Sequence, residues 1–243
     1  MLGKSKVKYI QSLGQKKHRD EEGLFIAEGP KLLAELLASP GTKIREIYAV
    51  NEWIKENKVS GDIAVIEVAE DDLGKISQLS TPNKAIALVE KFPIAEPVVL
   101  SSGLFLALDT IQDPGNMGTI IRIADWFGIS TILCSHECAD RYNPKVVQAT
   151  MGSIARVNVF YTDLASWLGT NGDVPVYAAV LNGDDIGRIP KPAHGVIVIG
   201  NESKGVSPSV MHRINREITI PRIGEAESLN AAVATGIILS HLV

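Results

Sequence analysis

The sequence predicts an α/β protein made of two successive blocks of strands and helices. Short apolar runs alternate with helical segments along the chain, which is typical of layered α/β folds. Most apolar runs of the second block are continuous, as expected for parallel strands that are covered on both faces. A proline-marked stretch, residues 93–97, lies between the blocks. These observations predict two domains, residues 1–92 and 104–243, joined by a linker over residues 93–103.

The first block begins with a helix predicted over residues 6–19. Strands are then predicted at residues 23–28, 44–50, 63–68 and 85–89, and helices at residues 30–37, 51–57 and 71–79. Pro30 suits the first turn of its helix and Asn51 suits an N-cap. We expect a small α/β domain.

The second block repeats the alternation. Strands are predicted at residues 104–108, 131–134, 156–160, 176–181, 196–199 and 218–220, and helices at residues 117–127, 144–151, 164–168, 207–213 and 231–243. The last helix is almost uncharged, so we expect it to be buried although chain ends usually fray.

The bulk composition is that of a globular protein. The 243 residues are 45% hydrophobic and 21% charged. We expect no membrane span and no signal peptide, because no sufficiently long apolar run is present. Two cysteines predict a reducing compartment, the cytoplasm. Cys134, His136 and Cys138 form a Cys-x-His-x-Cys pattern without a fourth ligand nearby, so we predict no metal site.

Basic residues are concentrated at the N-terminus, although the net charge is −4. The residues concerned are Lys4, Lys6, Lys8, Lys16, Lys17 and Arg19. Two interpretations are open from charge alone: a solvated helix, or a surface that binds phosphate.

Three segments place polar side chains just beyond predicted strands. In the first, Asn116 is positioned to cap the helix at 117–127, and Arg122 within that helix suits either an ion pair or a bound anion. In the second, Glu202 is the only acid of a glycine-bounded loop that matches neither a P-loop nor a dinucleotide fingerprint. In the third, Ser228 and Asn230 precede the last helix and suit N-caps.

The carboxyl ends of strands in one sheet can converge on a single pocket, so we expect the three segments to meet. A nucleophilic His or Cys is missing from them, which argues against acyl transfer.

Together the three segments resemble the SpoU (TrmH-like) class of RNA 2'-O-ribose methyltransferases in the SPOUT superfamily. The first family motif is Asp-Pro-x-Asn-x-Gly-x-Ile-x-Arg, and this chain has Asp113-Pro-Gly-Asn-Met-Gly-Thr-Ile-Ile-Arg122. The second reads Gly200-Asn-Glu-Ser-Lys-Gly205, and the third Ile220-Pro221 followed by Ser228-Leu-Asn230. The resemblance covers residues 104–243, and residues 1–92 resemble an L30-like substrate-binding domain. One departure is Ile123, where the family usually has Thr.

The resemblance implies a trefoil-knotted, mostly parallel sheet, a homodimer, and S-adenosylmethionine as methyl donor for the ribose 2'-hydroxyl of rRNA or tRNA. By this analogy the donor site consists of Leu181, Gly200, Asn201, Glu202, Gly205, Ile220, Ser228 and Leu229. The catalytic residues would be Arg122, Asn116, Glu202, Ser228 and Asn230. Because a guanidinium is almost never neutral, we interpret Arg122 as a clamp for phosphate that orients the 2'-oxygen.

An RNA substrate favours phosphate binding by the basic N-terminus. Two other interpretations stay open. One is a non-catalytic RNA-binding module on a knotted scaffold, which would not bind the donor. The other is a generic doubly wound small-molecule enzyme, which would not protect RNA ribose from alkaline cleavage.

Overall fold

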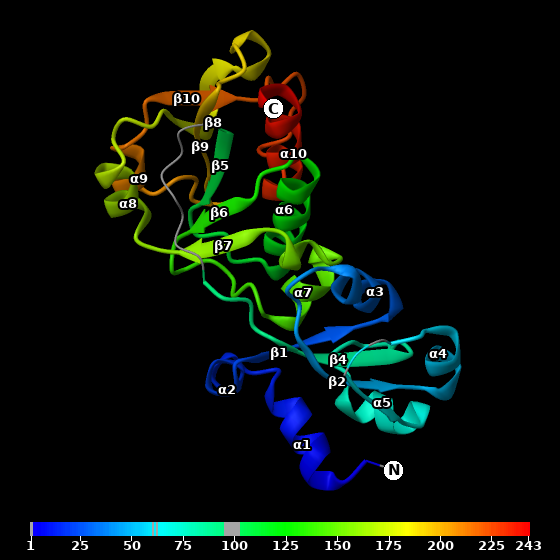
Figure 1. The fold of residues 1–243 in the computed structure, drawn as a ribbon. Helices are drawn as coiled ribbons and strands as arrows, with labels where there is room; N and C mark the ends of the chain where they lie inside the picture. The colour runs from blue at the N-terminus through cyan, green and yellow to red at the C-terminus, as the bar shows by residue number, and fades with distance from the viewer. Residues whose placement is uncertain (1, 60, 62, 95–102) are drawn as a thin grey trace. The chain divides into compact units, whose positions relative to one another are not determined.

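The computed structural model describes residues 2–59, 61, 63–94 and 103–243. The chain forms two compact units, each with its own sheet (Figure 1). The first contains Met1–Pro93 with Asp140–Ala155, and the second contains Ile94–Ala139 with Arg156–Val243. The grouping of Asp140–Ala155 with the first unit was not indicated by the sequence. The predicted linker, residues 93–103, lies mostly outside the described residues.

The first unit has a four-stranded mixed sheet. Its strands are β1 (Leu24–Glu28), β2 (Ile44–Ala49), β3 (Ala64–Glu67) and β4 (Ala85–Glu90), in the order β1-β4-β2-β3. Its helices are α1 (Lys4–Ser12), α2 (Lys16–Glu22), α3 (Pro30–Ala38), α4 (Asn51–Glu56), α5 (Glu70–Ile76) and α7 (Pro144–Thr150), followed by the 3-10 turn η1 (Ser153–Ala155). Only β2 and β3 pair in parallel among these described strands.

The single helix predicted over residues 6–19 is wrong, because the chain turns between α1 and α2. Arg19, only 2% exposed, stabilises this turn. Its Nη1 donates hydrogen bonds to the carbonyl oxygens of Leu13 (2.9 Å) and Gly14 (2.8 Å), and its Nη2 pairs with Asp140 Oδ2 at 2.6 Å. The guanidinium thus satisfies carbonyl groups that a helix end leaves without intrahelical partners.

The segment Asp140–Ala155 is packed into the first unit by more than this ion pair. Helix α7 lies against β1. The ring of Tyr142 contacts that of Phe25, with centroids 5.0 Å apart. Gly152 approaches Glu35 so closely that a Cβ at residue 152 would lie 2.4 Å from the Glu35 Cβ. The segment therefore completes the core of this unit.

The second unit has a six-stranded sheet in which every observed pair is parallel. The strands are β5 (Gly103–Leu108), β6 (Thr131–Cys134), β7 (Asn158–Tyr161), β8 (Val176–Asp185), β9 (His194–Ile199) and β10 (Arg216–Thr219), in the order β10-β8-β9-β5-β6-β7. The helical elements are α6 (Pro114–Trp126), α8 (Leu164–Thr170), η2 (Ile186–Arg188), α9 (Pro208–Met211) and α10 (Ala231–Leu242). The predicted α/β class with a parallel sheet is confirmed.

Helices cover both faces of this sheet (Figure 1). Leu164 and Leu168 of α8 and Val210 of α9 pack on one face. Helices α6 and α10 lie side by side on the other (Figure 1). The two helices approach each other at Gly236 of α10, where a Cβ would make ordinary van der Waals contact with Ile123 Cδ1 at 3.7 Å. In the described ranges, no helix has both the length and the apolar character needed to cross a membrane.

Strand β8 is longer than predicted and extends to Asp185, where a register shift in its pairing with β10 occurs between Glu217 and Ile218. Gly183 lies at this irregularity, and a Cβ there would be 2.7 Å from the backbone of Glu217. Polar residues at the end of β8 hid this extension in the sequence.

Candidate active site

The ends of β5, β9 and β10 bring the three motif segments together. Asn116 Nδ2 donates a hydrogen bond to Glu202 Oε1 at 2.5 Å. Asn230 Nδ2 donates to Asn116 Oδ1 at 2.8 Å. One residue from each segment thus belongs to a single hydrogen-bonded chain, although 114 positions separate Asn116 from Asn230.

The predicted role of Asn116 as helix cap is wrong. Helix α6 begins at Pro114, and its N-cap is Asp113, whose Oδ1 accepts the backbone N–H of Asn116 at 2.8 Å. Because Asp113 performs the capping, the Asn116 side chain is available for Glu202 and Asn230. Gly128, with φ +73°, lies just beyond the end of the helix, where a left-handed glycine commonly terminates a helix.

Asn230 has two functions at once. Its Oδ1 accepts the backbone N–H groups of Ala232 (3.0 Å) and Val233 (3.3 Å), which confirms it as the N-cap of α10. Its Nδ2 points to Asn116. The capping oxygen fixes the orientation of the amide, so the helix start itself orients the donor toward the site.

Arg122 and Ser228 are exposed, and neither belongs to the hydrogen-bonded chain. No ion pair to Arg122 forms among the described residues, which removes the structural ion-pair interpretation of this arginine. Its charge is therefore available to an anion from solution.

The predicted donor-site residues form two groups. Asn201 and Gly205 close the glycine loop through two backbone hydrogen bonds of 2.9 Å. Gly200 is crowded by this closure, because a Cβ there would lie 2.4 Å from the backbone carbon of Gly205. Leu181 (66% exposed) and Leu229 (45% exposed) offer apolar surface to solvent.

The remaining predicted donor-site residue, Ile220, is half-buried. It follows Thr219, whose Oγ1 donates to the carbonyl oxygen of Leu181 at 3.0 Å, so the ends of β8 and β10 lie together. From Pro221 to Asn230 every residue is exposed and none lies in a helix or strand.

A polar layer beneath the motif loops was missed by the sequence analysis. Asp109, which is buried, accepts the backbone N–H of Ser207 at 2.7 Å. Thr110 Oγ1 donates to the other oxygen of Asp109 at 3.2 Å. A carboxylate directly after a buried strand is the one sequence signal that marks this layer.

Cys138 supports the same loop. Its Sγ accepts the backbone N–H of Ile111 at 3.3 Å and donates to the carbonyl oxygen of Leu108 at 3.1 Å. The hydrogen bond with Cys134 lowers the pKa of the Cys138 thiol below its usual range. Cys134 and Cys138 are both buried thiols, and neither is in a disulfide.

The basic N-terminal residues differ in whether their charges are available to bind phosphate. The prediction that Arg19 binds phosphate is contradicted, because its guanidinium is buried and paired with Asp140. Lys6 pairs with Glu46 at 2.7 Å, and Lys16 pairs with Asp20 at 2.6 Å. Lys4 and Lys8 are exposed and form no ion pair within the described part of the chain. Lys17 is also exposed, and its ion pair with Glu21 Oε1 is long, at 3.9 Å.

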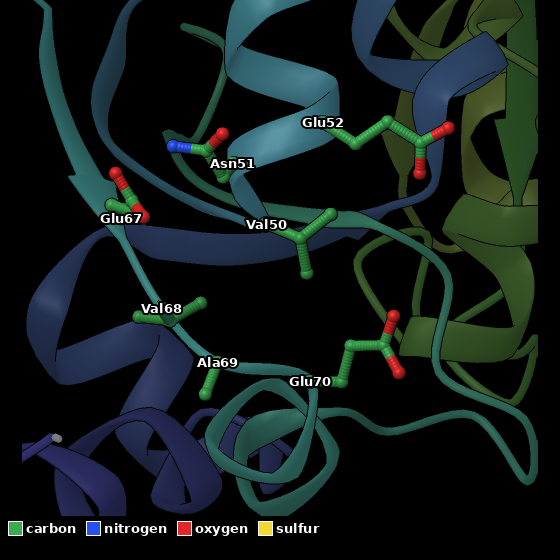
Figure 2. A pocket seen from close by; sticks show the side chains of 7 residues that line it. All are labelled: Val50, Asn51, Glu52, Glu67, Val68, Ala69 and Glu70. Carbon is green, nitrogen blue, oxygen red and sulfur yellow. The ribbon is translucent and has the colours of Figure 1, made fainter.

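A surface pocket of about 530 Å³ lies in the first unit, between the starts of α4 and α5 (Figure 2). Its lining residues are Val50, Asn51, Glu52, Glu67, Val68, Ala69 and Glu70. Figure 2 shows the carboxylates of Glu52 and Glu70 on one side and that of Glu67 on the other. An acidic lining repels phosphate. No cluster of three or more His, Cys, Asp or Glu residues suited to a metal ion occurs among the described residues.

Comparison with known proteins now identifies the family. Residues 103–240 match the model of the SpoU rRNA Methylase family. The chain belongs to this family. In this SpoU protein, residues 4–87 also match the model of the MRM3-like substrate binding domain.

This SpoU chain is similar to characterised and solved relatives over nearly its full length. It is 33% identical to the 23S rRNA (guanosine(2553)-2'-O)-methyltransferase RlmP of Bacillus subtilis, covering 98% of this chain and 95% of that protein. A putative RNA methyltransferase of the TrmH family from Porphyromonas gingivalis is 38% identical, with a TM-score of 0.89 and coverage of 100% and 98%. An AdoMet-bound rRNA methyltransferase from Sinorhizobium meliloti is 34% identical, with a TM-score of 0.86 and coverage of 100% and 95%.

Proposed function

We propose that this protein transfers a methyl group from S-adenosylmethionine to the 2'-hydroxyl of a ribose in RNA. The observation that carries the proposal is the hydrogen-bonded chain of Asn116, Glu202 and Asn230, which joins the three motif segments of a SpoU protein. The relative in Bacillus subtilis is a 23S rRNA methyltransferase, which favours rRNA as the substrate class.

The residues of the second unit have the chemical character that binding of the proposed donor requires. Exposed Leu181 and Leu229 offer apolar surface for the adenine ring. The backbone of the crowded Gly200 loop and of the exposed segment after β10 would hold the polar atoms. When bound, S-adenosylmethionine supplies an electrophilic methyl carbon next to a sulfonium.

The protein's own part in the reaction is to position the ribose. Arg122 is exposed and unpaired among the described residues, so it can bind a substrate phosphate and orient the 2'-oxygen. Asn116 is held by Glu202 and Asn230, which fixes its amide against the ribose. Holding two reactants in line supplies much of the rate of such a transfer. The proton of the hydroxyl leaves as the oxygen attacks, with the substrate phosphate assisting its removal.

The test is labelled-methyl transfer to total RNA from a strain that lacks this protein, with mapping of the modified position. Arg122→Ala is expected to abolish transfer and to leave the Kd for S-adenosylmethionine, measured by calorimetry, nearly unchanged. Arg188→Ala, which removes an exposed arginine of η2, is the matched control and is expected to retain activity. Normal transfer by the Arg122 variant would exclude the proposed role.

We further propose that the first unit binds the RNA through Lys4, Lys8 and Lys17. Their exposure and the match to a substrate-binding domain support this. Reversal of Lys8 and Lys17 to Glu is expected to weaken RNA binding and to reduce its salt dependence by about one phosphate contact for each lysine. Lys55→Glu, at an exposed site on α4, controls for net charge. An unchanged salt slope would reject this surface.

We also propose a homodimer that pairs through α6 and α10, with the knotted path of the family in the second unit. Trp126 on α6 is 85% exposed and Val233 on α10 is 52% exposed, so a partner would cover apolar surface. Trp126→Glu is expected to shift the mass measured by light scattering from two chains to one. A variant with unchanged mass would argue for another interface. The two free cysteines support a cytoplasmic site of action.

A further inference from the structure

Thr110 adopts a backbone conformation that is rare for its residue type. Its φ is +62°, in the left-handed region. Among the described residues only Lys84 and Met151 share this feature without being glycine, and neither is β-branched. A β-branched residue in this region is a strained outlier that persists only when its surroundings fix it.

The surroundings of Thr110 engage every polar group that it has. Its backbone N–H donates to Ser135 Oγ at 3.0 Å, and its carbonyl oxygen accepts Asn201 Nδ2 at 2.9 Å. Its hydroxyl donates to Asp109 at 3.2 Å, and the second oxygen of that buried carboxylate is occupied by the N–H of Ser207. The conformation is thus held by Ser135, which follows β6, by Asn201 of the glycine loop, and by Asp109, which Ser207 in turn contacts.

The position of Thr110 gives this arrangement a consequence for the site. Thr110 is the first residue after Asp109 in the loop that leads to Asn116 and Arg122 on α6. The glycine loop meets this first loop twice, through Asn201 with Thr110 and through Glu202 with Asn116. The two contacts lie at opposite ends of the same short loop.

We propose that Thr110 is a positioning residue for methyl transfer. Its fixed left-handed conformation sets the place of Asn116 and Arg122 relative to the glycine loop. The inference rests on the proposed function, because the positioned residues are those assigned to the ribose and the donor. Its strain is retained because relaxation would free the loop.

Thr110→Gly tests this, because it removes the hydroxyl bond to Asp109 and widens the range of backbone conformations open to the loop, while glycine still adopts the left-handed region without strain. The expected result is a fall in kcat of about tenfold or more, with the Kd for S-adenosylmethionine unchanged and the melting temperature within a few degrees of wild type. Thr110→Ser keeps the hydroxyl and is expected to restore most of the rate. Lys84→Gly makes the matched change in the first unit and is expected to retain wild-type kcat.

Amide hydrogen exchange provides a readout that does not depend on activity. Exchange of the amides from Ile111 to Asn116 is expected to accelerate in Thr110→Gly. Ser135→Ala, which removes the acceptor of the Thr110 N–H, is expected to do the same and serves as a second variant if the first fails to fold. Wild-type exchange and kcat in both variants would overturn the inference.

Different results would refute the proposed function and the positioning role of Thr110. A wild-type protein that transfers no methyl group to any RNA refutes the proposed function, and the exchange measurement still tests the role of Thr110. A rate that falls only in proportion to the folded fraction would show that Thr110 is structural and not a positioning residue.

Discussion

The double role of Asn230 allows stability and activity to be separated by two substitutions of one residue. Asn230→Ala removes both the cap of α10 and the hydrogen bond to Asn116. Asn230→Asp keeps an oxygen that accepts the N–H groups of Ala232 and Val233, and a negative charge at a helix start is favourable. It replaces the donor toward Asn116, however, with a second acceptor.

The Asn116 amide cannot satisfy both neighbours of the aspartate variant. It presents its nitrogen to Glu202 and its oxygen to residue 230. Turning the amide over would restore one contact and break the other, so one hydrogen bond is lost in either orientation.

The expected magnitudes differ between the two variants. Loss of the cap lowers the free energy of unfolding of Asn230→Ala by about 1 kcal/mol, whereas that of Asn230→Asp stays within about 0.5 kcal/mol of wild type. Loss of one hydrogen bond worth about 0.5–1.5 kcal/mol lowers kcat/KM about two- to thirteenfold in both variants. The lower figure is favoured if water replaces the contact, because Asn230 is exposed.

Urea unfolding and methyl transfer measured on the same preparations test this separation. The reasoning is refuted if Asn230→Asp transfers methyl groups at the wild-type rate, or if it is as destabilised as Asn230→Ala.

Substitutions at three other residues have measurable expected outcomes. Arg19→Ala removes the partner of half-buried Asp140 and the donor to the Leu13 and Gly14 carbonyl oxygens, and it should lower the free energy of unfolding measured in urea by about 1.5–3 kcal/mol. Exposed Lys17→Ala should cost about 0.5 kcal/mol or less, and equal losses would contradict the structural role of the guanidinium. Gly200→Ala should raise the Kd for S-adenosylmethionine about tenfold or more, because the added Cβ would clash with the backbone of Gly205. Gly224→Ala is the control: its Cβ would have no atom within 4 Å, so it should bind the donor with the wild-type Kd in the same calorimetry. Burial raises the pKa of Glu28, so its contribution to stability is present below its unfolded value of about 4.3 and is lost as pH rises through the higher folded value. Glu28→Gln should therefore gain in stability relative to wild type between pH 4 and pH 7, and a difference that does not change with pH would count against this assignment.

The strands of the second unit could be predicted because each is marked by a pattern within its own short stretch of sequence. Continuous apolar runs mark buried parallel strands, and β5 begins one residue before the predicted range of 104–108. The convergence of Asn116, Glu202 and Asn230 was also predicted, because each residue lies in a segment that follows a strand of the same sheet. Residue type predicted both Ser228 and Asn230 as caps of α10, and the structure confirms Asn230 but not Ser228 as the N-cap.

The wrong predictions concern residues whose role depends on a contact with a residue far away in the sequence. Asn116 and Asp113 are both good caps, and only the contact with Glu202 distinguishes their roles. Arg19 has the same charge as the neighbouring lysines, but its partner Asp140 lies 121 positions away. The left-handed conformation of Thr110 has no signal in its residue type, because threonine disfavours it.

The return of residues 140–155 to the first unit has a consequence for how such proteins can diversify. The chain passes between the units after Pro93, after Ala139 and after Ala155. A gene segment that ends before the first methyltransferase motif therefore encodes an incomplete first unit, without the partner of Arg19 and without the ring that packs on Phe25. Recombination cannot exchange this unit as one contiguous cassette. Point changes can instead alter the first unit without separating it from residues 140–155.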